Sequence, residues 1–541
     1  MNGKLFLLLS CGLLAAWQCA AIAPPSGGPK DTTPPELISA DPPSETVRLL
    51  DQTIELHFSE YMGEQSFIKG IRFSPFLEGE HHVSFKGDRV FITFPEGVKN
   101  EMTVVMTLSR DIKDEHGVEM AKAVQLAYST GDEIDHGVIR GKVYGESVSA
   151  VYLFHDDHGD SLLLGRPNYI AETEDDGSFE FNFLASGKYK ILTVERGVTG
   201  LQLDPKRMSY GLPFFSGIEL DSIYTGVRMR LFKEEEPLRL LSGEWKDWNW
   251  GKLHFNNEFV EGMAIQGLNI GGQEMEWFGH PDDEKAIIVT VSDTIQREKE
   301  KISFEKIVMD HSVLLDSSGV NVSIPAAGDT NYLTLVTPAS KLAVTPDQSG
   351  PPVELVFSRP LGDRLLTNLK IDLMIDDTTM VDYKYMILSP MKIAVIPQNG
   401  WEPKQSYQLK LFRHETSSIK ETFKDSVITI KIETTRPQGY GGFSGSVKGY
   451  DSGNLITHIK SVENNEWNFK SVVNSERRFE YNNIPESSYI FFVFDDRDQN
   501  TEYSHGSAFP FEPSEWFYVL PDTIEIRANW DIEYQPILMD K

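Results

Sequence analysis

Two short segments gather residue types that could hold a metal ion. Asp496, Asp498 and Asn500 offer side-chain oxygens at alternate positions, which is how a calcium-binding loop begins. The pattern then fails, because Thr501 stands where such a loop needs glycine and Ser507 stands where it needs glutamate. We expect a plain interstrand loop here, with a calcium site of another geometry as the alternative.

The second segment is His155–Asp160, which contains histidines and aspartates in close succession. Both residue types are ligands for zinc and similar divalent ions. The same composition is typical of a polar turn between strands, and adjacent side chains seldom converge on one ion. We therefore expect a solvated turn and no metal at this segment.

Trp245, Trp248 and Trp250 form the densest aromatic patch of the chain. On a continuous strand Trp248 and Trp250 would share one face, and Trp245 would take the other. Exposed indoles stack on sugar rings or anchor protein interfaces, whereas buried ones fill a core or a joint between domains. We expect packing in a core or joint, with a protein interface and a sugar platform as alternatives.

Signatures of common enzymes are missing from the sequence. It contains no Gly-x-Ser-x-Gly elbow, no phosphate-binding Gly-rich loop that ends in Gly-Lys-Ser/Thr, and no His-Glu-x-x-His metal helix. The only two cysteines, Cys11 and Cys19, lie near the N-terminus, so the rest of the chain offers no thiol and no disulfide. We predict that the protein is not an enzyme and needs no cofactor.

Composition and charge exclude further classes of function. The 541 residues include 51 Lys and Arg against 81 Asp and Glu, for a net charge of −30. Such a surface repels nucleic acid and anionic lipid headgroups, because binding either one requires clustered cations. Hydrophobic residues make up 40% of the chain, which is enough to form cores. The long apolar run is confined to the first residues, which excludes a polytopic membrane protein.

The N-terminus has the pattern of a secretory signal peptide. A positive start, Met1–Lys4, precedes an apolar stretch that reaches Trp17 and is too short to span a bilayer comfortably. Cys19 follows at a position where a cysteine can take a lipid on its sulfur, after which the chain is cut before it. The residues before Cys11 match a lipidation site better, but the apolar run there is too short. We predict lipidation of Cys19, with an ordinary secreted protein as the alternative.

The segment after Cys19 has the composition of an extended tether. About 14 Pro-rich residues at roughly 3.1 Å each would reach about 43 Å. The first positions after Cys19 carry only Lys30 before Asp31, whereas export to the cell surface is often associated with acidic residues there. Periplasmic and surface exposure therefore both stay open.

The run Cys-Ala-x-x-x-x-Pro-Ser-Gly-Gly-Pro-Lys-Asp-Thr-Thr-Pro-Pro, from Cys19 to Pro35, resembles the start of a group of Bacteroidota outer-membrane lipoproteins. In that group the tether leads into a bacterial Ig-like domain of the SbsA type. The resemblance implies a lipid anchor in the outer membrane, followed by a β domain.

The body of the chain alternates apolar and polar residues, as half-buried strands do. Ile54, Leu56 and Phe58 illustrate the period of two, and clusters of Gly, Pro, Asn and Asp follow at short intervals. This pattern is typical of antiparallel sandwiches. Asp293–Met309 fits a short helix and a charged edge strand equally well.

The chain also repeats itself. Leu56–Gly63 corresponds to Leu355–Gly362, and the strand patterns that follow each of them agree in order and rough spacing. Each unit precedes a second type, which opens with Gly137–Gly145 or Gly442–Gly449. This second type resembles transthyretin-like, carboxypeptidase-regulatory-like sandwiches.

Within the first of these units we predict a hairpin. Asp175-Asp176-Gly177 would supply the turn, and Phe179 and Phe181 would face the core. Tyr189 and Ile191 would return on the neighbouring strand.

We therefore predict an all-β protein of tandem antiparallel β-sandwiches, Ig-like and transthyretin-like, in an elongated array. The predicted ranges are a signal peptide at 1–18, a lipidated cysteine and tether at 19–33, an Ig-like domain at 34–135, a transthyretin-like sandwich at 136–237, a middle β domain at 238–340, a second Ig-like domain at 341–437 and a second transthyretin-like sandwich at 438–541.

The predicted function is that of a non-catalytic outer-membrane lipoprotein. It would act as a scaffold or accessory subunit of an envelope protein complex, such as the machinery for outer-membrane protein assembly or secretion. Short sandwiches joined by short linkers present loops and edge strands for pairing, and the lipid keeps them close to their partners. The alternative is a surface lipoprotein that binds glycans.

Overall fold

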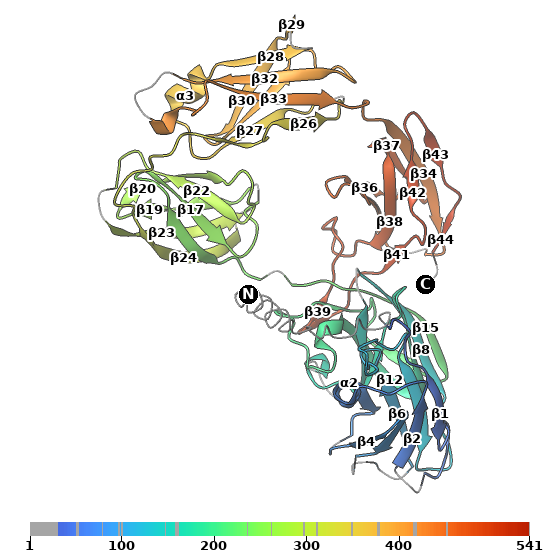
Figure 1. The fold of residues 1–541 in the computed structure, drawn as a ribbon. Helices are drawn as coiled ribbons and strands as arrows, with labels where there is room; N and C mark the ends of the chain where they lie inside the picture. The colour runs from blue at the N-terminus through green and yellow to red at the C-terminus, as the bar shows by residue number, and fades with distance from the viewer. Residues whose placement is uncertain are drawn as a thin grey trace, which may run out of the picture. The chain divides into compact units, whose positions relative to one another are not determined.

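The computed structural model is almost wholly β, with antiparallel pairing in most sheets (Figure 1). It describes residues 31–539 apart from short gaps at 50–52, 78, 96–97, 99–100, 146–147, 157–161, 235, 261, 296–297, 310–311, 348–349, 376–378, 415–418 and 451–452. The prediction of an all-β fold of tandem sandwiches is confirmed. Within the described part of the chain, no helix is both long and apolar enough to cross a membrane.

The described chain divides into two compact units. Unit 1 runs to residue 203 and includes 215–231, and unit 2 comprises 204–214 and everything from 232 onward. Five hydrophobic cores follow one another along the sequence, within 54–128, 139–229, 238–324, 333–432 and 443–539. We call the corresponding bodies the first to fifth sandwiches. Their order agrees with the predicted ranges, whose exact boundaries stay predictions.

The first sandwich has one sheet with strand order β1-β2-β5-β4 and another with order β3-β6-β7. Its strands are β1 (Leu37–Asp41), β2 (Thr53–Phe58), β3 (Ile71–Ser74), β4 (His82–Lys86), β5 (Arg89–Thr93), β6 (Thr103–Leu108) and β7 (Val124–Ser129). Ile54, Leu56 and Phe58 are buried between the sheets, as their alternation predicts.

The second sandwich packs β10-β9-β12, with β14 also on β12, against β11-β8-β15. Its strands are β8 (Gly137–Tyr144), β9 (Ser149–His155), β10 (Tyr169–Glu172), β11 (Ser178–Leu184), β12 (Gly187–Glu195), β14 (Ile218–Leu220) and β15 (Ile223–Arg230). The short strand β13 (Tyr210–Gly211) belongs to unit 2.

The third sandwich combines the sheet β16-β17-β22-β21 with the sheet β18-β23-β19-β20, in which β24 also pairs with β23. Its strands are β16 (Leu240–Trp245), β17 (Trp250–Phe255), β18 (Ala264–Gln266), β19 (Asn269–Ile270), β20 (Gln273–Glu274), β21 (Glu276–Gly279), β22 (Ala286–Thr290), β23 (Lys299–Met309) and β24 (Ser312–Ser323). The ambiguous segment Asp293–Met309 thus contains a strand, because Ile302 and Phe304 alternate into the core.

The fourth sandwich has the sheets β25-β27-β31-β30 and β26-β33-β32-β28-β29. Its strands are β25 (Leu335–Thr337), β26 (Lys341–Val344), β27 (Val353–Phe357), β28 (Ile371–Ile375), β29 (Thr379–Met380), β30 (Tyr383–Ser389), β31 (Lys392–Pro397), β32 (Ser406–Phe412) and β33 (Val427–Thr434).

The fifth sandwich has β34 between β37 and β43, with β44 also on β34, and a second sheet β36-β35-β38-β41 with β42 on β38. Its strands are β34 (Tyr440–Lys448), β35 (Leu455–Ser461), β36 (Asn468–Val472), β37 (Arg478–Pro485), β38 (Ser487–Asp495), β39 (Ser507–Ala508), β40 (Phe511–Glu512), β41 (Phe517–Val519), β42 (Ile524–Ile526), β43 (Asp531–Glu533) and β44 (Ile537–Leu538).

Helices are short and few among the described residues. They are α2 (Glu64–Gly70), α3 (Asp363–Asn368) and the 3-10 turns η1 (Leu162–Leu164), η2 (Arg196–Val198) and η3 (Ile419–Glu421).

The two repeats seen in the sequence have matching topologies. The order β1-β2-β5-β4 in the first sandwich corresponds to β25-β27-β31-β30 in the fourth, and α2 and α3 follow equivalent strands. In the second and fifth sandwiches the opening strand, β8 or β34, lies between an antiparallel strand and a parallel one. A shared topology is what a repeated hydrophobic pattern produces when the same faces must be buried.

The predicted hairpin around Gly177 is only half correct. The turn forms, since the Gly177 N–H donates to the Glu174 carbonyl, and Phe179 and Phe181 are buried. Tyr189 and Ile191, however, lie on β12, which pairs with β9 and β14 in the opposite sheet rather than with β11. Alternation shows which face of a strand is buried, but both sheets of a sandwich bury their faces in the same core.

Candidate functional site

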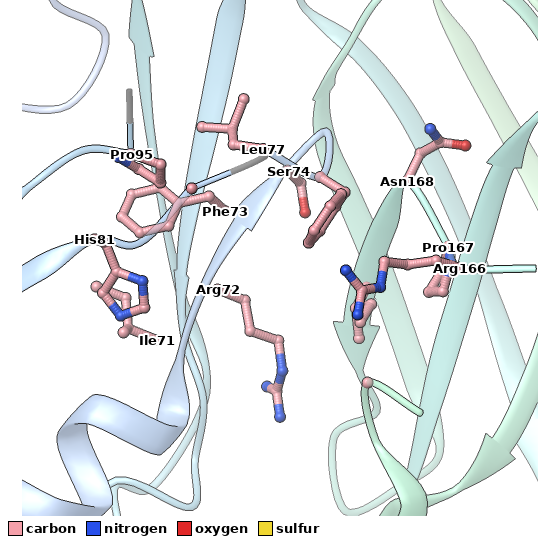
Figure 2. Close-up of a pocket in the computed structure, with 14 residues that line it drawn as sticks. Ile71, Arg72, Phe73, Ser74, Leu77, His81, Pro95, Arg166, Pro167 and Asn168 are labelled. Carbon is pink, nitrogen blue, oxygen red and sulfur yellow. The ribbon is translucent and has the colours of Figure 1, made fainter. Parts of the chain in front are cut away.

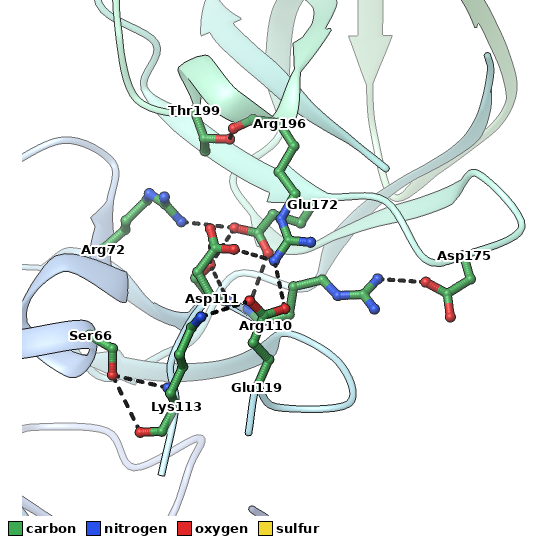
Figure 3. Close-up of polar contacts among 11 residues, drawn as sticks. Ser66, Arg72, Arg110, Asp111, Lys113, Glu119, Glu172, Asp175, Arg196 and Thr199 are labelled. Carbon is green, nitrogen blue, oxygen red and sulfur yellow. Dashed lines mark hydrogen bonds and ion pairs between the residues drawn. The ribbon is translucent and has the colours of Figure 1, made fainter. Parts of the chain in front are cut away.

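A network of charged side chains joins the first two sandwiches; we call it the first joint (Figure 3). Glu172 lies at the end of β10 with only 2% of its side chain exposed. Its Oε1 accepts from Arg72 Nη1 at 3.0 Å and from Ser109 Oγ at 2.6 Å, while Oε2 accepts the Arg110 N–H at 3.2 Å. These three donors belong to the first sandwich, so one buried carboxylate connects two domains.

Further ion pairs surround Glu172. Arg196, in η2 of the second sandwich, pairs with Asp111 and lies 3.5 Å from Glu119 in the first sandwich. Burial alone would lower the pKa of Arg196, but these carboxylates raise it above its ordinary value. Arg110 reaches back to Asp175 at 2.8 Å. Each of the two sandwiches therefore contributes an arginine that pairs with a carboxylate of the other.

A cavity of about 330 Å³ lies beside this network (Figure 2). Phe73, Leu77 and His81 line one wall, and Arg166, Pro167 and Asn168 line the other. The Phe76 N–H donates to the Asn168 carbonyl at 3.0 Å, and the Arg166 guanidinium lies 4.3 Å from the Phe76 ring centroid.

His81 contributes a buried imidazole to this cavity. Burial lowers the pKa of that imidazole, and its Nε2 has no hydrogen-bond partner among the described residues.

A second joint, in unit 2, connects the third and fourth sandwiches around Asp247. This carboxylate is 2% exposed and accepts from Lys420 Nζ at 2.8 Å and from the Asp329 N–H at 3.2 Å. Burial alone would raise its pKa, but the bonds from Lys420 and from the Trp248 and Asp329 N–H groups lower it below the ordinary value. Arg359 in turn pairs with Asp329 at 2.7 Å.

The three tryptophans do not share one strand, and Trp248 is the one that lies at this second joint. Trp245 ends β16 and is buried, Trp250 begins β17 and is half-buried, and Trp248 lies in the turn between them, 40% exposed. Lys420 Nζ lies 5.2 Å from the Trp248 ring centroid. The prediction that Trp248 and Trp250 share a strand face is wrong, because the strand ends at Trp245 and the chain turns. The expected packing in a core or joint describes Trp245 and Trp248 well.

The predicted calcium-loop residues do lie together, with one addition. Oxygens of Asp496, Asp498 and Glu515 lie within 4.8 Å of one another, and Asn500 hydrogen-bonds to Asp498. Glu515 lies far along the chain, so sequence spacing could not reveal it. Backbone N–H groups of Asn500, Arg497 and Ser504 donate to these carboxylates, as in an ordinary interstrand loop. Whether the loop binds calcium stays untested.

Two predictions fall on residues outside the described ones. Cys19 and residues 20–30 of the predicted tether at 19–33 lie outside the described residues, and most of the predicted polar turn, 157–160, is in a gap. His155 ends β9 with its ring 4.8 Å from that of Tyr189.

An unpaired edge strand is the feature that sequence reasoning missed. Among the described strands, β30 ends its sheet and pairs with β31 alone. Met386, Ile387 and Leu388 follow one another on it and are 47%, 47% and 49% exposed. The sequence YKYMILS reads as an ordinary strand, and its place at an edge depends on the tertiary order of the sheet.

Residues 31–130 match the family model described as bacterial Ig-like domain. This range contains the first sandwich, which is thus similar to a bacterial Ig-like domain. The Ig-like part of the resemblance noted from the sequence is thereby confirmed, and the match does not extend to the lipoprotein part. No curated protein matches the chain.

Solved structures similar to the chain include the N-terminal part of the bacterial S-layer protein SbsC, at 9% identity over 37% of this chain and 44% of that one, with a TM-score of 0.17. Another is E. coli alpha-2-macroglobulin, at 11% identity over 91% and 34%, with a TM-score of 0.15. A third is BcpA, the major pilin subunit of Bacillus cereus, at 10% identity over 75% and 99%, with a TM-score of 0.14. This chain spans less than half the length of the first two.

Proposed function

We propose that the protein is a non-catalytic lipoprotein of the outer membrane that positions a partner protein of the cell envelope. Its partner would supply an extended apolar segment that pairs with β30 of the fourth sandwich. The exposed edge of β30 is the observation that carries this proposal.

An edge strand offers unpaired backbone N–H and C=O groups to another chain, and natural proteins usually protect such edges with charge, proline or a bulge. β30 has only Lys384 as a charged residue. Its register with β31 is regular from Tyr383 to Ile387 and shifts between Ile387 and Ser389, so the regular part of the edge is what a partner strand would pair with. Three adjacent exposed apolar side chains add surface that a pairing strand would bury. The edge therefore suits strand addition by a protein partner.

The charged joints support positioning as the mode of action. A scaffold must hold its modules at a fixed angle, and short linkers alone leave relative motion between domains. Buried carboxylates that bond across both joints, Glu172 and Asp247, restrict that motion. The lipid predicted on Cys19 would keep the assembly at the membrane.

The test uses the full chain in its own membrane. A photo-crosslinking residue in place of Ile387 should give one dominant adduct, and mass spectrometry should place the crosslink in an extended segment of an envelope protein. Ile387→Lys should reduce recovery of that partner at least about tenfold, because pairing would bury an unpaired charge.

Val462→Lys is the matched control, since Val462 is 56% exposed in a different domain. It should leave partner recovery unchanged. A clean monomer in mild detergent, or equal recovery with Ile387→Lys, would contradict the proposal.

A further inference from the structure

Four potential metal ligands meet at one end of the first sandwich. They are Asp31, Glu60, Asp114 and His116, and one ligand atom from each lies within 4.8 Å of all the others. Asp31 precedes β1, Glu60 follows β2, and the other two lie in the segment between β6 and β7. We call these residues the carboxylate cluster. The cluster includes one direct pair, His116 Nδ1 to Asp31 Oδ2 at 3.6 Å.

Asp114 is the most deeply buried member of the carboxylate cluster. The residue is 3% exposed and its Oδ1 accepts the Val118 N–H at 2.8 Å, whereas its buried Oδ2 has no hydrogen-bond partner among the residues that the structure describes. A buried carboxylate oxygen without a donor is costly, because it has lost water and gained nothing in exchange. Among the described residues, no Lys or Arg forms an ion pair with Asp31, Glu60 or Asp114.

The fourth sandwich has an equivalent position, but a residue of opposite charge stands there. Ser59 bonds through its N–H and Oγ to the backbone of Glu36, and Ser358 makes the same two bonds with Thr334. The next residue is Glu60 in the first sandwich and Arg359 in the fourth.

The aspartate that precedes this repeat is also preserved. Asp31 lies five residues before Glu36, and Asp329 lies five before Thr334. In the fourth sandwich Arg359 pairs with Asp329 at 2.7 Å, so a guanidinium supplies positive charge. In the first sandwich the corresponding position is one more carboxylate.

From this comparison we propose that the first sandwich binds a divalent metal ion through Asp31, Glu60 and Asp114, with His116 at the rim. The ion takes the electrostatic role that Arg359 has in the fourth sandwich. This inference is independent of docking at β30.

The ligand set narrows the choice of ion. Three carboxylates satisfy a hard cation such as Ca²⁺ or Mn²⁺, and the imidazole nitrogen admits Mn²⁺ or Zn²⁺. The ion would also link Asp31 to Glu60 and Asp114 of the first sandwich.

The experiment measures binding directly on the full chain after treatment with a chelator. Isothermal titration with Ca²⁺, Mn²⁺ and Zn²⁺ separately should show one saturable site for at least one of them. Asp114→Asn should weaken that binding at least about tenfold, because an amide oxygen carries no charge. Asp31→Asn should do the same, and because the Asp31 side chain is 32% exposed, the substitution leaves the hydrophobic core unchanged.

Glu60→Arg tests the comparison between repeats. It should abolish ion binding and raise the melting temperature of the metal-free protein. The new guanidinium would supply positive charge to the neighbouring carboxylates, as Arg359 does for Asp329. His116→Ala should weaken the binding of Mn²⁺ and Zn²⁺ more than that of Ca²⁺ when the imidazole is a ligand, and should leave all three unchanged when only the carboxylates bind. Either result identifies the ligand set.

Glu219→Gln, at an exposed carboxylate of the second sandwich, is the matched control and should leave the titration unchanged. Binding that is lost in Asp498→Asn belongs to the acidic group of the fifth sandwich and not to the carboxylate cluster. Absence of binding for all three ions would overturn the proposal. So would binding that survives Asp31→Asn and Asp114→Asn, or binding that is lost only in Asp498→Asn.

Discussion

At the scale of single residues, two buried carboxylates connect neighbouring domains. Glu172 accepts hydrogen bonds from two side chains and one backbone N–H of the first sandwich, and Asp247 bonds to Lys420 and to the Asp329 N–H. Each carboxylate is buried and well supplied with donors, which offsets the desolvation of its charge. Such residues restrict the angle between neighbouring sandwiches and do not take part in the hydrophobic packing of either core.

Glu172→Ala should open the first joint. The substitution leaves Arg72 and Ser109 without their acceptor, at a cost of about 3 kcal/mol. Hydrogen exchange in β6 and β9 should measure the loss of stability. Tryptophan fluorescence would not report on these two sandwiches, because no tryptophan lies between residues 31 and 244. Glu219→Ala is the control, because its pair with Lys188 is exposed and worth about 0.5 kcal/mol. Equal exchange in both variants would contradict the role of Glu172.

The lowered pKa of Asp247 predicts that the free energy of unfolding depends on pH in the acid range. Its pKa is lowered in the folded chain, so its stabilising charge is present above the ordinary pKa of 3.8 and is lost as the pH falls towards the folded value. Asp247→Asn should cost about 1–2 kcal/mol at pH 7, and this difference from the parent should shrink below pH 3.8. Urea unfolding followed by tryptophan fluorescence measures it; a difference that does not change with pH would contradict the assignment.

At the scale of elements, turns decide how the strands of each sandwich are divided between its sheets. Gly177 connects β10 of one sheet to β11 of the other and has φ +83°. A Cβ there would lie 2.2 Å from the Val143 carbonyl oxygen. The turn therefore requires glycine both for its left-handed backbone and for the close approach of β8.

Gly177→Ala should destabilise the second sandwich by about 3 kcal/mol, because left-handed strain and a backbone clash add together. Gly200→Ala isolates the strain, since Gly200 has φ +86° and no atom within 4 Å of its added Cβ. That control should cost only about 1 kcal/mol. Hydrogen exchange in β8 and β11 compares the two; similar losses would show that the clash relaxes.

At the scale of the whole molecule, the chain is a series of sandwiches with a strongly acidic surface. A net charge of −30 keeps such modules soluble and apart from anionic surfaces. The lipid proposed on Cys19 would supply the attachment to a membrane, because one cysteine with several acyl chains anchors firmly.

Cys19→Ser should release the protein from membranes. The wild-type chain should stay with the vesicle pellet after carbonate washing, and the variant should appear in the supernatant. Cys11→Ser is the control, since the cysteine within the signal peptide would be removed with it. A variant that sediments as firmly as the wild type would contradict lipid anchoring.

The sequence by itself determined the class of fold and the order of the modules. Period-two alternation at Ile54, Leu56 and Phe58 follows from local backbone geometry, and so it could be read without any knowledge of partners. The repeat of Leu56–Gly63 in Leu355–Gly362 likewise corresponds to matching strand orders.

Only the tertiary structure decided which residues meet. Tyr189 is in the sheet opposite Phe181, Glu515 joins Asp496, and Asp114 approaches Asp31 across more than eighty residues of sequence. The exposed edge at Ile387 likewise depends on which strand of the sheet lacks a neighbour. The physical reason is that alternation shows only that a side chain is buried, whereas its partners depend on sheet order and turn geometry over long separations.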